Sequence, residues 1–231
     1  MERLAAGEQV LPISVGPGAR LPLPDREIGV VLADAHARDI VRARTHAKTG
    51  WTVACRALTP TPGHTDEFAE VKYHWEDFYL QQAMDDDFVG CRPTQASSVD
   101  ADGVVPHPPS PTNTLTGWAF RPDALGIAIR NAADITNGTP ILVTENGIAA
   151  DDDERRFQYI GEALDVLFDA TDDGIDVRGY LHWSATDTFE GDHWAPVFGL
   201  TGVDRTRLAR TPRPSLSRLG DIARNGYRRA A

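Results

Sequence analysis

The sequence predicts an α/β fold in which four short strands alternate with helices. Two observations indicate it. Apolar residues recur at helical spacing in five segments, and four shorter apolar runs bounded by turn residues lie between these segments. Strands connected through helices pair in parallel, because each connection crosses the sheet before the next strand begins. Four such βα units are half of an eight-stranded (β/α)8 TIM barrel.

The amino-terminal part of the chain is expected to supply two of the four strands. Residues 1–25 contain four prolines and are expected to form an irregular lead-in. A helix over 27–48 should precede a strand over 51–57, because its apolar positions recur on one helical face. By the same reasoning, a helix over 66–83 precedes a buried strand over 88–91.

The carboxyl-terminal part is expected to supply the other two strands, which makes residues 1–231 a single incomplete barrel-like domain. Residues 96–116 are rich in Pro, Ser and Asp, and a loop of that length is either a functional lid or disordered. The elements expected after it are, in order, a helix over 122–135, a strand over 140–144, a helix over 153–170, a strand over 177–183, a loop over 184–213 and a last helix over 214–225.

Composition excludes several classes of partner. A formal net charge of -11 argues against nucleic acid and against anionic membrane surfaces, because both would repel the chain. No apolar run approaches the roughly 20 residues of a membrane span. The first residues lack the profile of a secretory signal, so a cytoplasmic location is expected. Cys55 and Cys91 fall in expected strands and are interpreted as buried free thiols.

No metal or cofactor is expected. The seven histidines and two cysteines lack metal-binding spacing. The acidic run Asp85–Asp87 lacks the alternation and the glycine of a calcium loop, so it is expected to be a solvated turn. Gly16-Pro17-Gly18 lacks the third glycine of a dinucleotide loop, and no Gly-x-Ser-x-Gly elbow is present.

Candidate functional residues follow two neighbouring strands. Glu145 comes directly after the 140–144 strand, and the carboxyl ends of parallel strands are where α/β barrels hold their active sites. Trp183 ends the next strand, and Glu190 follows in the loop after it. Two carboxylates and an indole suit a carbohydrate, because sugar C–H faces stack on aromatic rings and sugar hydroxyls need acceptors. Core packing for the indole and solvated surface charge for the carboxylates are the alternatives.

Four ordered motifs resemble one known family. They are Val143–Gly147, Val177–Ser184, Asp187–Glu190 and Phe198–Leu200, and together they are similar to the carboxyl-terminal signature of glycoside hydrolase family 1, the β-glucosidase-like enzymes. The tail Arg210–Ser215 resembles bacterial members, and Ala35-His36, Asp87–Gly90 and Gly117-Trp118 fit more loosely. The resemblance covers most of the chain.

This resemblance implies a retaining β-glycosidase on a (β/α)8 barrel, of which the chain would carry the last four βα units. It implies that Glu145 is the nucleophile, that Trp183 is the platform under the sugar, and that Glu190 holds the sugar's outer hydroxyls. Trp194 is counted with the substrate-binding residues, although core packing remains open for it. The implied ligand is a small saccharide or β-glycoside.

The chain also departs from the family pattern. The family's acid/base glutamate lies in an Asn-Glu-Pro motif that is missing here, and Glu8 in Gly7–Gln9 is the nearest candidate. Arg92–Thr94 replaces an Asn-Tyr-Tyr segment, which places Arg92 or Thr94 within reach of Glu145. Gly191 stands where the family commonly has tryptophan.

Two hypotheses follow. In the first, the chain is a partial enzyme that carries the nucleophile half of a site, completed by a homo-oligomer or by a complementing half-barrel chain. Retaining hydrolysis needs a second carboxyl, and an open half barrel leaves apolar edges exposed. In the second, the chain is a catalytically inactive half barrel that binds carbohydrate or acts as a scaffold.

Overall fold

The centre of the molecule is an open, four-stranded parallel sheet. A computed structural model describes residues 24–93, 96–105, 107–190, 194 and 196–227, with side chains from residue 33 onward. The strands lie in the order β1-β3-β6-β7 and are β1 (Thr52–Val53), β3 (Val89–Cys91), β6 (Ile141–Asn146) and β7 (Val177–His182). All three strand pairings are parallel, which confirms the predicted α/β class.

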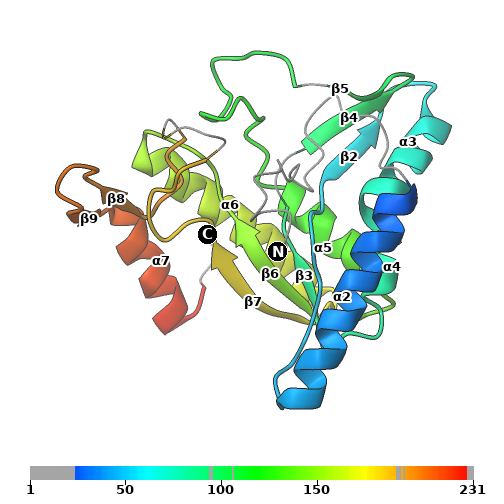
Figure 1. The fold of residues 1–231 in the computed structure, drawn as a ribbon. Coiled ribbons are helices and arrows are strands. Elements are labelled where there is room, and N and C mark those ends of the chain that lie inside the picture. Colours follow the sequence, from blue (N-terminus) through cyan, green and yellow to red (C-terminus); the bar gives the residue numbers. More distant parts are fainter. Residues whose placement is uncertain (1–23, 94–95, 106, 191–193, 195, 228–231) are drawn as a thin grey trace.

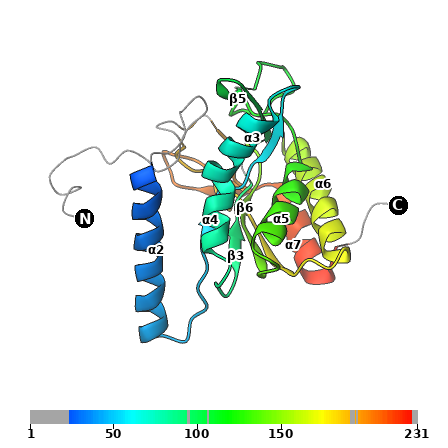
Figure 2. The ribbon, with the colours of Figure 1, turned by 90° about the vertical axis from the view of Figure 1, so that its right-hand side faces the viewer.

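Two long helices cover one face of this sheet. Helix α5 (Ala124–Ile135) packs beside α6 (Asp153–Asp172), as Figures 1 and 2 show. Leu125 and Ile129, four residues apart on one face of α5, are both fully buried in the main core. They meet Ile141 and Val143 of β6, which are also fully buried. The helices therefore cover one face of the inner strand β6, whereas Leu142 and Thr144, which point to the other face, are only partly buried.

A second, smaller sheet was not predicted. The expected 51–57 strand divides into β1 and β2 (Ala57–Pro60), and β2 joins the different sheet β2-β4-β5. The prediction of a loop over 96–116 is wrong in part, because β4 (Ala96–Asp100) and β5 (Gly103–Val105) form an antiparallel hairpin there. Two valines pack the hairpin against the rest of the protein, since Val99 and Val104 are buried in a separate small core.

The acidic turn Asp85–Asp87 is partly buried, which corrects the prediction of a solvated turn. The side chain of Asp86 is fully inaccessible, forms an ion pair with Arg38 and accepts a hydrogen bond from the Trp51 backbone amide at 3.0 Å. Arg38 belongs to α2 (Pro24–Arg44), which lies at the opposite side of the molecule from the last helix, α7 (Pro214–Asn225) (Figures 1 and 2). The apolar face of α2 is uncovered near its end, where Ile40 is 50% exposed.

The remaining helical segments match the expected positions. The predicted 66–83 helix is present as α3 (Thr65–Lys72), a π-helical turn (Tyr73–Asp77) and α4 (Phe78–Gln82). The last helix is α7 (Pro214–Asn225), which begins with proline at its first turn. The 184–213 segment, expected to be loop, contains the two-stranded pair β8 (Thr201–Val203) and β9 (Arg210–Pro212).

Candidate functional site

A pocket opens at the carboxyl ends of the parallel strands β3, β6 and β7. It holds about 440 Å³ of empty space, including its open mouth. The residues that line it are Arg92, Pro93, Trp118, Glu145, Asn146, Gly147, Trp183, Glu190 and Phe198. Glu145, Trp183 and Glu190, which the sequence proposed separately, therefore share one cavity. Carboxylates beside aromatic rings suit a ligand with hydroxyl groups and apolar C–H faces.

Glu145 is held near the end of β6 by the buried residue that follows it. Asn146 is 1% exposed, and its side-chain amide donates to the Tyr159 hydroxyl at 3.2 Å. The Tyr180 hydroxyl donates to the Asn146 side-chain oxygen at 3.1 Å. The Asn146 carbonyl also accepts the Trp183 backbone amide at 3.0 Å. These bonds connect the ends of β6 and β7, so they fix Glu145 relative to Trp183.

The polar groups beneath the pocket are uncharged near neutral pH. Burial lowers the pKa of His182 to about 4, with a smaller contribution from the charge of Arg156. Burial raises the pKa of Tyr159 to about 12 and raises that of Tyr180 well above its ordinary value. Tyr159, Tyr180 and His182 therefore add no charge beneath the pocket near neutral pH.

Arg92 brings a cation to the candidate nucleophile. It follows β3 directly, and its guanidinium Nη1 lies 3.5 Å from Oε2 of Glu145. Both side chains are partly open to solvent, at 35% for Arg92 and 29% for Glu145. The expectation that Arg92 reaches Glu145 is met at this distance, which is the outer limit of a hydrogen bond. Thr94, the other candidate for that contact, lies outside the described residues.

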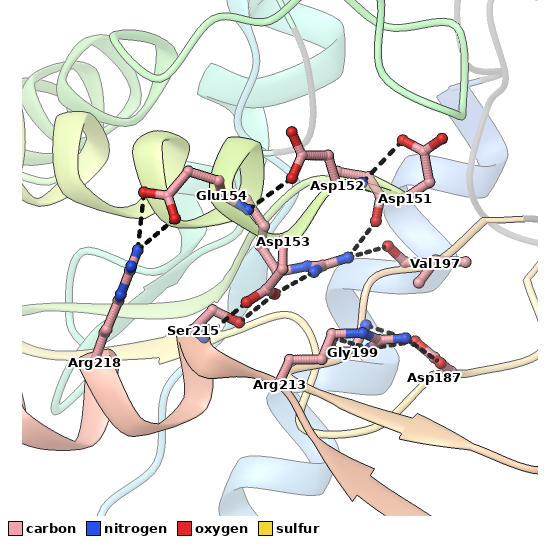
Figure 3. Close-up of polar contacts among 12 residues, drawn as sticks. Asp151, Asp152, Asp153, Glu154, Asp187, Val197, Gly199, Arg213, Ser215 and Arg218 are labelled. Atoms are coloured by element: carbon pink, nitrogen blue, oxygen red, sulfur yellow. Dashed lines mark hydrogen bonds and ion pairs between the residues drawn. The ribbon is translucent and has the colours of Figure 1, made fainter.

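Glu190 sits on a loop that is anchored at its base. The Thr188 hydroxyl donates to the Glu190 carboxylate. One residue before Thr188, the Asp187 carboxylate accepts two hydrogen bonds from the Arg213 guanidinium, at 3.0 and 2.8 Å (Figure 3). Burial by itself would raise the pKa of the Asp187 carboxyl. Hydrogen bonding and the charge of Arg213 together lower this pKa by a larger amount, so the net shift is downward. The anchor therefore stays charged and strong near neutral pH.

A fully buried arginine joins the loops around the pocket to the first turn of α6. Arg156 donates to the backbone carbonyls of Ala150 and Val197, the latter at 3.0 Å, and to the Asp153 carboxylate at 2.6 Å. Asp153 also accepts the backbone amide and the hydroxyl of Ser215, at 2.8 and 2.7 Å (Figure 3). One ion pair thus connects the start of α6, the start of α7 and the loop before Phe198.

Trp194 is the predicted site residue that the structure places elsewhere. It is 39% exposed, its ring centroid lies 5.2 Å from that of Phe189, and the Arg205 guanidinium lies 4.9 Å from its ring. It is not among the residues that line the pocket. Its contact with a sugar stays a prediction. Glu8 and Gly191 lie outside the described residues.

Two aromatic residues of the lining were not proposed from the sequence. Trp118 and Phe198 face each other with ring centroids 6.4 Å apart, and both line the pocket. Both stand in motifs used for the family resemblance, which was the available signal. The residue types alone could not show that Trp118 and Phe198 line the pocket, because isolated aromatic residues are more often core residues than ligand contacts.

Metal sites and membrane spans can be assessed over the described part of the chain. There, no group of three or more His, Cys, Asp or Glu side chains could hold a metal ion. No helix in the same residues is long and apolar enough to cross a bilayer.

Comparison with known proteins places these motifs in context. The model of a family described as glycosyl hydrolase family 1 matches residues 35–226. A bifunctional β-D-glucosidase/β-D-fucosidase of Bifidobacterium breve is 35% identical over 140 residues, which are 53% of this chain and 30% of that protein. Thermostable β-glucosidase B of Thermobispora bispora is 35% identical over 124 residues, which are 49% of this chain and 26% of that protein.

Solved structures give the same result. The crystal structure of β-glycosidase BGL167 matches 87% of this chain with a TM-score of 0.78 and 35% identity. The match covers 49% of the BGL167 chain, so this chain spans about half the length of that relative.

Proposed function

Because this chain belongs to glycosyl hydrolase family 1, we propose that it is a partial retaining β-glycosidase that carries the nucleophile half of the active site. The observation that supports the proposal most is the shared pocket of Glu145, Trp183 and Glu190. The ligand is a small saccharide or β-glycoside. The four parallel strands correspond, in this proposal, to the last four of a (β/α)8 barrel.

In the proposed reaction, the Glu145 carboxylate attacks the anomeric carbon and the aglycone leaves, which produces a covalent glycosyl-enzyme. Trp183 stacks on the C–H face of the sugar, and Glu190 accepts hydrogen bonds from its hydroxyls. Hydrolysis of the intermediate restores the carboxylate and retains the configuration of the sugar.

A complete cycle needs a second carboxyl group about 5–5.5 Å from the nucleophile, which protonates the leaving oxygen and then activates water. Among the described residues of the pocket lining, the other carboxylate is Glu190, which the proposal assigns to the sugar hydroxyls. We therefore infer that the acid/base group comes from outside the described lining, for example from another copy of this chain or from a complementing half barrel.

The proposal is tested with a substrate whose leaving group departs without a proton. The chain is incubated with 2,4-dinitrophenyl 2-deoxy-2-fluoro-β-D-glucopyranoside, alone and with a candidate partner half, and analysed by intact mass and peptide mapping. We expect one fluorosugar per chain, attached to Glu145, and no label in E145Q. The matched control is E162Q, which alters an exposed glutamate on α6 and should label like the original chain.

The second candidate is a non-catalytic carbohydrate-binding or scaffold protein. The ion pair between Arg92 and Glu145 favours it, because a carboxylate engaged by a guanidinium is a weaker nucleophile. This candidate predicts that sugar binding, measured by calorimetry, survives in E145Q while no label forms in the original chain. Failure to label Glu145 with the partner half present would refute the first candidate.

A further inference from the structure

Arg92 is the residue that contacts the carboxylate of the candidate nucleophile. Its guanidinium Nη1 lies 3.5 Å from Oε2 of Glu145. In the described part of the chain, the Glu145 side chain has no other hydrogen bond or ion pair. A contact at Oε2 leaves Oε1 as the oxygen that can attack a sugar in the proposed reaction.

The sheet fixes the backbone around Arg92. The Arg92 amide donates to a carbonyl of β1 at 3.0 Å. Cys91, the residue before it, is fully buried and pairs with Val143 of β6. Pro93 follows, and a residue before proline is restricted to extended backbone conformations. Arg92 therefore leaves β3 beside the end of β6, where Glu145 lies.

The groups around Arg92 favour Glu145 as its partner. Burial lowers the pKa of Arg56 to about 10, and the charge of Arg92 contributes to that decrease, so the two cations are near enough to repel. The other carboxylate of the pocket lining, Glu190, accepts from the Thr188 hydroxyl. The cation of the lining therefore contacts the carboxylate that reacts in the proposed function.

This contact is stronger with one state of Glu145 than with the other. Before the reaction, and again after release of the sugar, Glu145 is a carboxylate, and its bond to the guanidinium is charge-assisted. In the glycosyl-enzyme Glu145 is an ester, and Oε2 is a neutral carbonyl oxygen that accepts more weakly. Glu190 takes no part in either step, so the difference comes from this one contact and not from the net charge of the pocket.

We propose that Arg92 is a positioning residue that acts through Glu145, slowing formation of the glycosyl-enzyme and accelerating its breakdown. This inference rests on the proposed function. In the first step, Oε1 attacks the anomeric carbon, and the electron pair of the breaking bond leaves with the aglycone oxygen. In the second step, a water oxygen attacks that carbon, the electron pair of the ester bond returns to Glu145, and the proton of water passes to the acid/base group or to solvent. Arg92 stabilises the carboxylate, which is the reactant of the first step and the product of the second.

The expected effect is modest, because the two side chains are 35% and 29% exposed. Solvent weakens exposed ion pairs, and 3.5 Å is the outer limit of a hydrogen bond. The two transition states carry part of the charge of the carboxylate, so the effect divides between the two steps. Loss of the guanidinium charge should therefore change each rate constant about two- to threefold, in opposite directions.

The test follows both steps in the full chain by intact mass, with 2,4-dinitrophenyl 2-deoxy-2-fluoro-β-D-glucopyranoside as the reagent. The first rate constant is that of labelling at saturating reagent, and the second is that of label loss in buffer after the excess reagent is removed. We expect R92Q to label about two- to threefold faster than the original chain and to lose the label about two- to threefold more slowly. R92K keeps the positive charge and should return both rate constants toward the original values. The matched control R178Q, which removes an exposed arginine paired with Asp176, should match the original chain.

The outcomes separate this inference from the proposed function. If the original chain labels on Glu145 and R92Q changes neither rate constant, the proposed function stands and the role of Arg92 is overturned. A decrease of both rate constants in R92Q also overturns it, because damage to the pocket slows both steps, whereas loss of the charge acts on them in opposite directions. Equal behaviour of R92K and R92Q would refute the argument from charge. Absence of labelling in the original chain and in every variant removes the proposed function and this inference together.

Discussion

Gly147 lies against the backbone of Trp183 so closely that a Cβ atom at position 147 would meet the Trp183 carbonyl oxygen at 2.0 Å. The same Cβ atom would lie 2.9 Å from the His182 ring. Real Cβ contacts are never so short, so position 147 requires glycine for space. The turn after Glu145 and the end of β7 are therefore a single packed unit, and both contribute to the pocket.

Replacing this glycine should disturb the pocket more than the rest of the fold. G147A forces the Trp183 backbone to move, at a cost of about 1–3 kcal/mol, as for other overpacked sites. We expect a lower melting temperature, together with loss of sugar-dependent quenching of tryptophan fluorescence. The control is G161A on α6, where no atom lies within 4 Å of the added Cβ. It should raise the free energy of unfolding by about 0.5–1 kcal/mol, since alanine favours the helix. Equal effects of the two variants would contradict this account.

The buried arginine of α6 should be a major determinant of stability. In R156M, the Ala150 carbonyl loses the Arg156 donor, the Val197 carbonyl keeps only the Ala150 backbone amide, and Asp153 loses its cation. Breaking a buried ion pair from one side leaves the partner charge uncompensated, so we expect a loss of about 3 kcal/mol or more.

Urea unfolding measures this loss. R130Q is its control, because Arg130 pairs with Asp173 on the exposed surface. Exposed pairs contribute about 0–1 kcal/mol, so R130Q should unfold near the midpoint of the original chain. A similar midpoint for R156M would show that the buried pair contributes little.

The anchor of the Glu190 loop should affect sugar affinity rather than the chemical step. Lysine at position 213 keeps the charge but cannot form the two-pronged contact with Asp187. In R213K, we expect the fluorosugar concentration for half-maximal labelling to rise about three- to tenfold, roughly 1 kcal/mol. The labelling rate at saturation should change less. R218Q, which breaks an exposed pair between α7 and Glu154 of α6, should change neither quantity. A collapse of the saturating rate would instead place Arg213 in the positioning of Glu145.

The buried acid of the π-helical turn should make stability decrease as pH rises. Glu76 is 1% exposed, and burial raises its pKa to about 8. The unfolded carboxyl has its ordinary pKa of 4.5. The folded state therefore keeps a proton that the unfolded state has released between these values. Its stabilisation is complete below the unfolded pKa and is lost as pH rises toward 8, by up to about 1.4 kcal/mol per pH unit.

Urea unfolding at several pH values measures this slope. E76Q stays neutral and can still accept from the Arg56 amide, so it should gain stability relative to the original chain as pH rises. The exposed variant E70Q, on neighbouring α3, should keep the original slope. Parallel pH profiles for E76Q and the original chain would mean that Glu76 ionises normally.

The strongly periodic elements could be predicted from the sequence. The inward face of α5 follows from the spacing of Leu125 and Ile129, and both are fully buried. The β4-β5 hairpin could not be predicted in this way, because its strands are short and half of residues 96–105 are Ser, Asp or Gly, so Val99 and Val104 show no clear period. The burial of Asp86 depends on Arg38, which is distant in sequence, so composition alone indicated a solvated turn.

The residues of the site likewise divide into those that the sequence predicted and those that only the folded structure shows. Glu145 and Trp183 were proposed because each ends a predicted strand, and parallel strands place their carboxyl ends at one edge. Trp118 and Phe198 were not proposed, since they reach the pocket through packing of loops. The network of Arg156 likewise joins residues from three separate segments, which no local sequence pattern records.

The sequence by itself determined the α/β class, the order of the helices and the residues at the strand ends, because helical and strand periodicities are local properties of the chain. The tertiary structure decided which of those residues share a pocket, that Arg92 lies against Glu145, and that Trp194 lies outside the lining. These relationships depend on contacts between distant segments, and burial and charge pairing select such contacts only when the chain is folded.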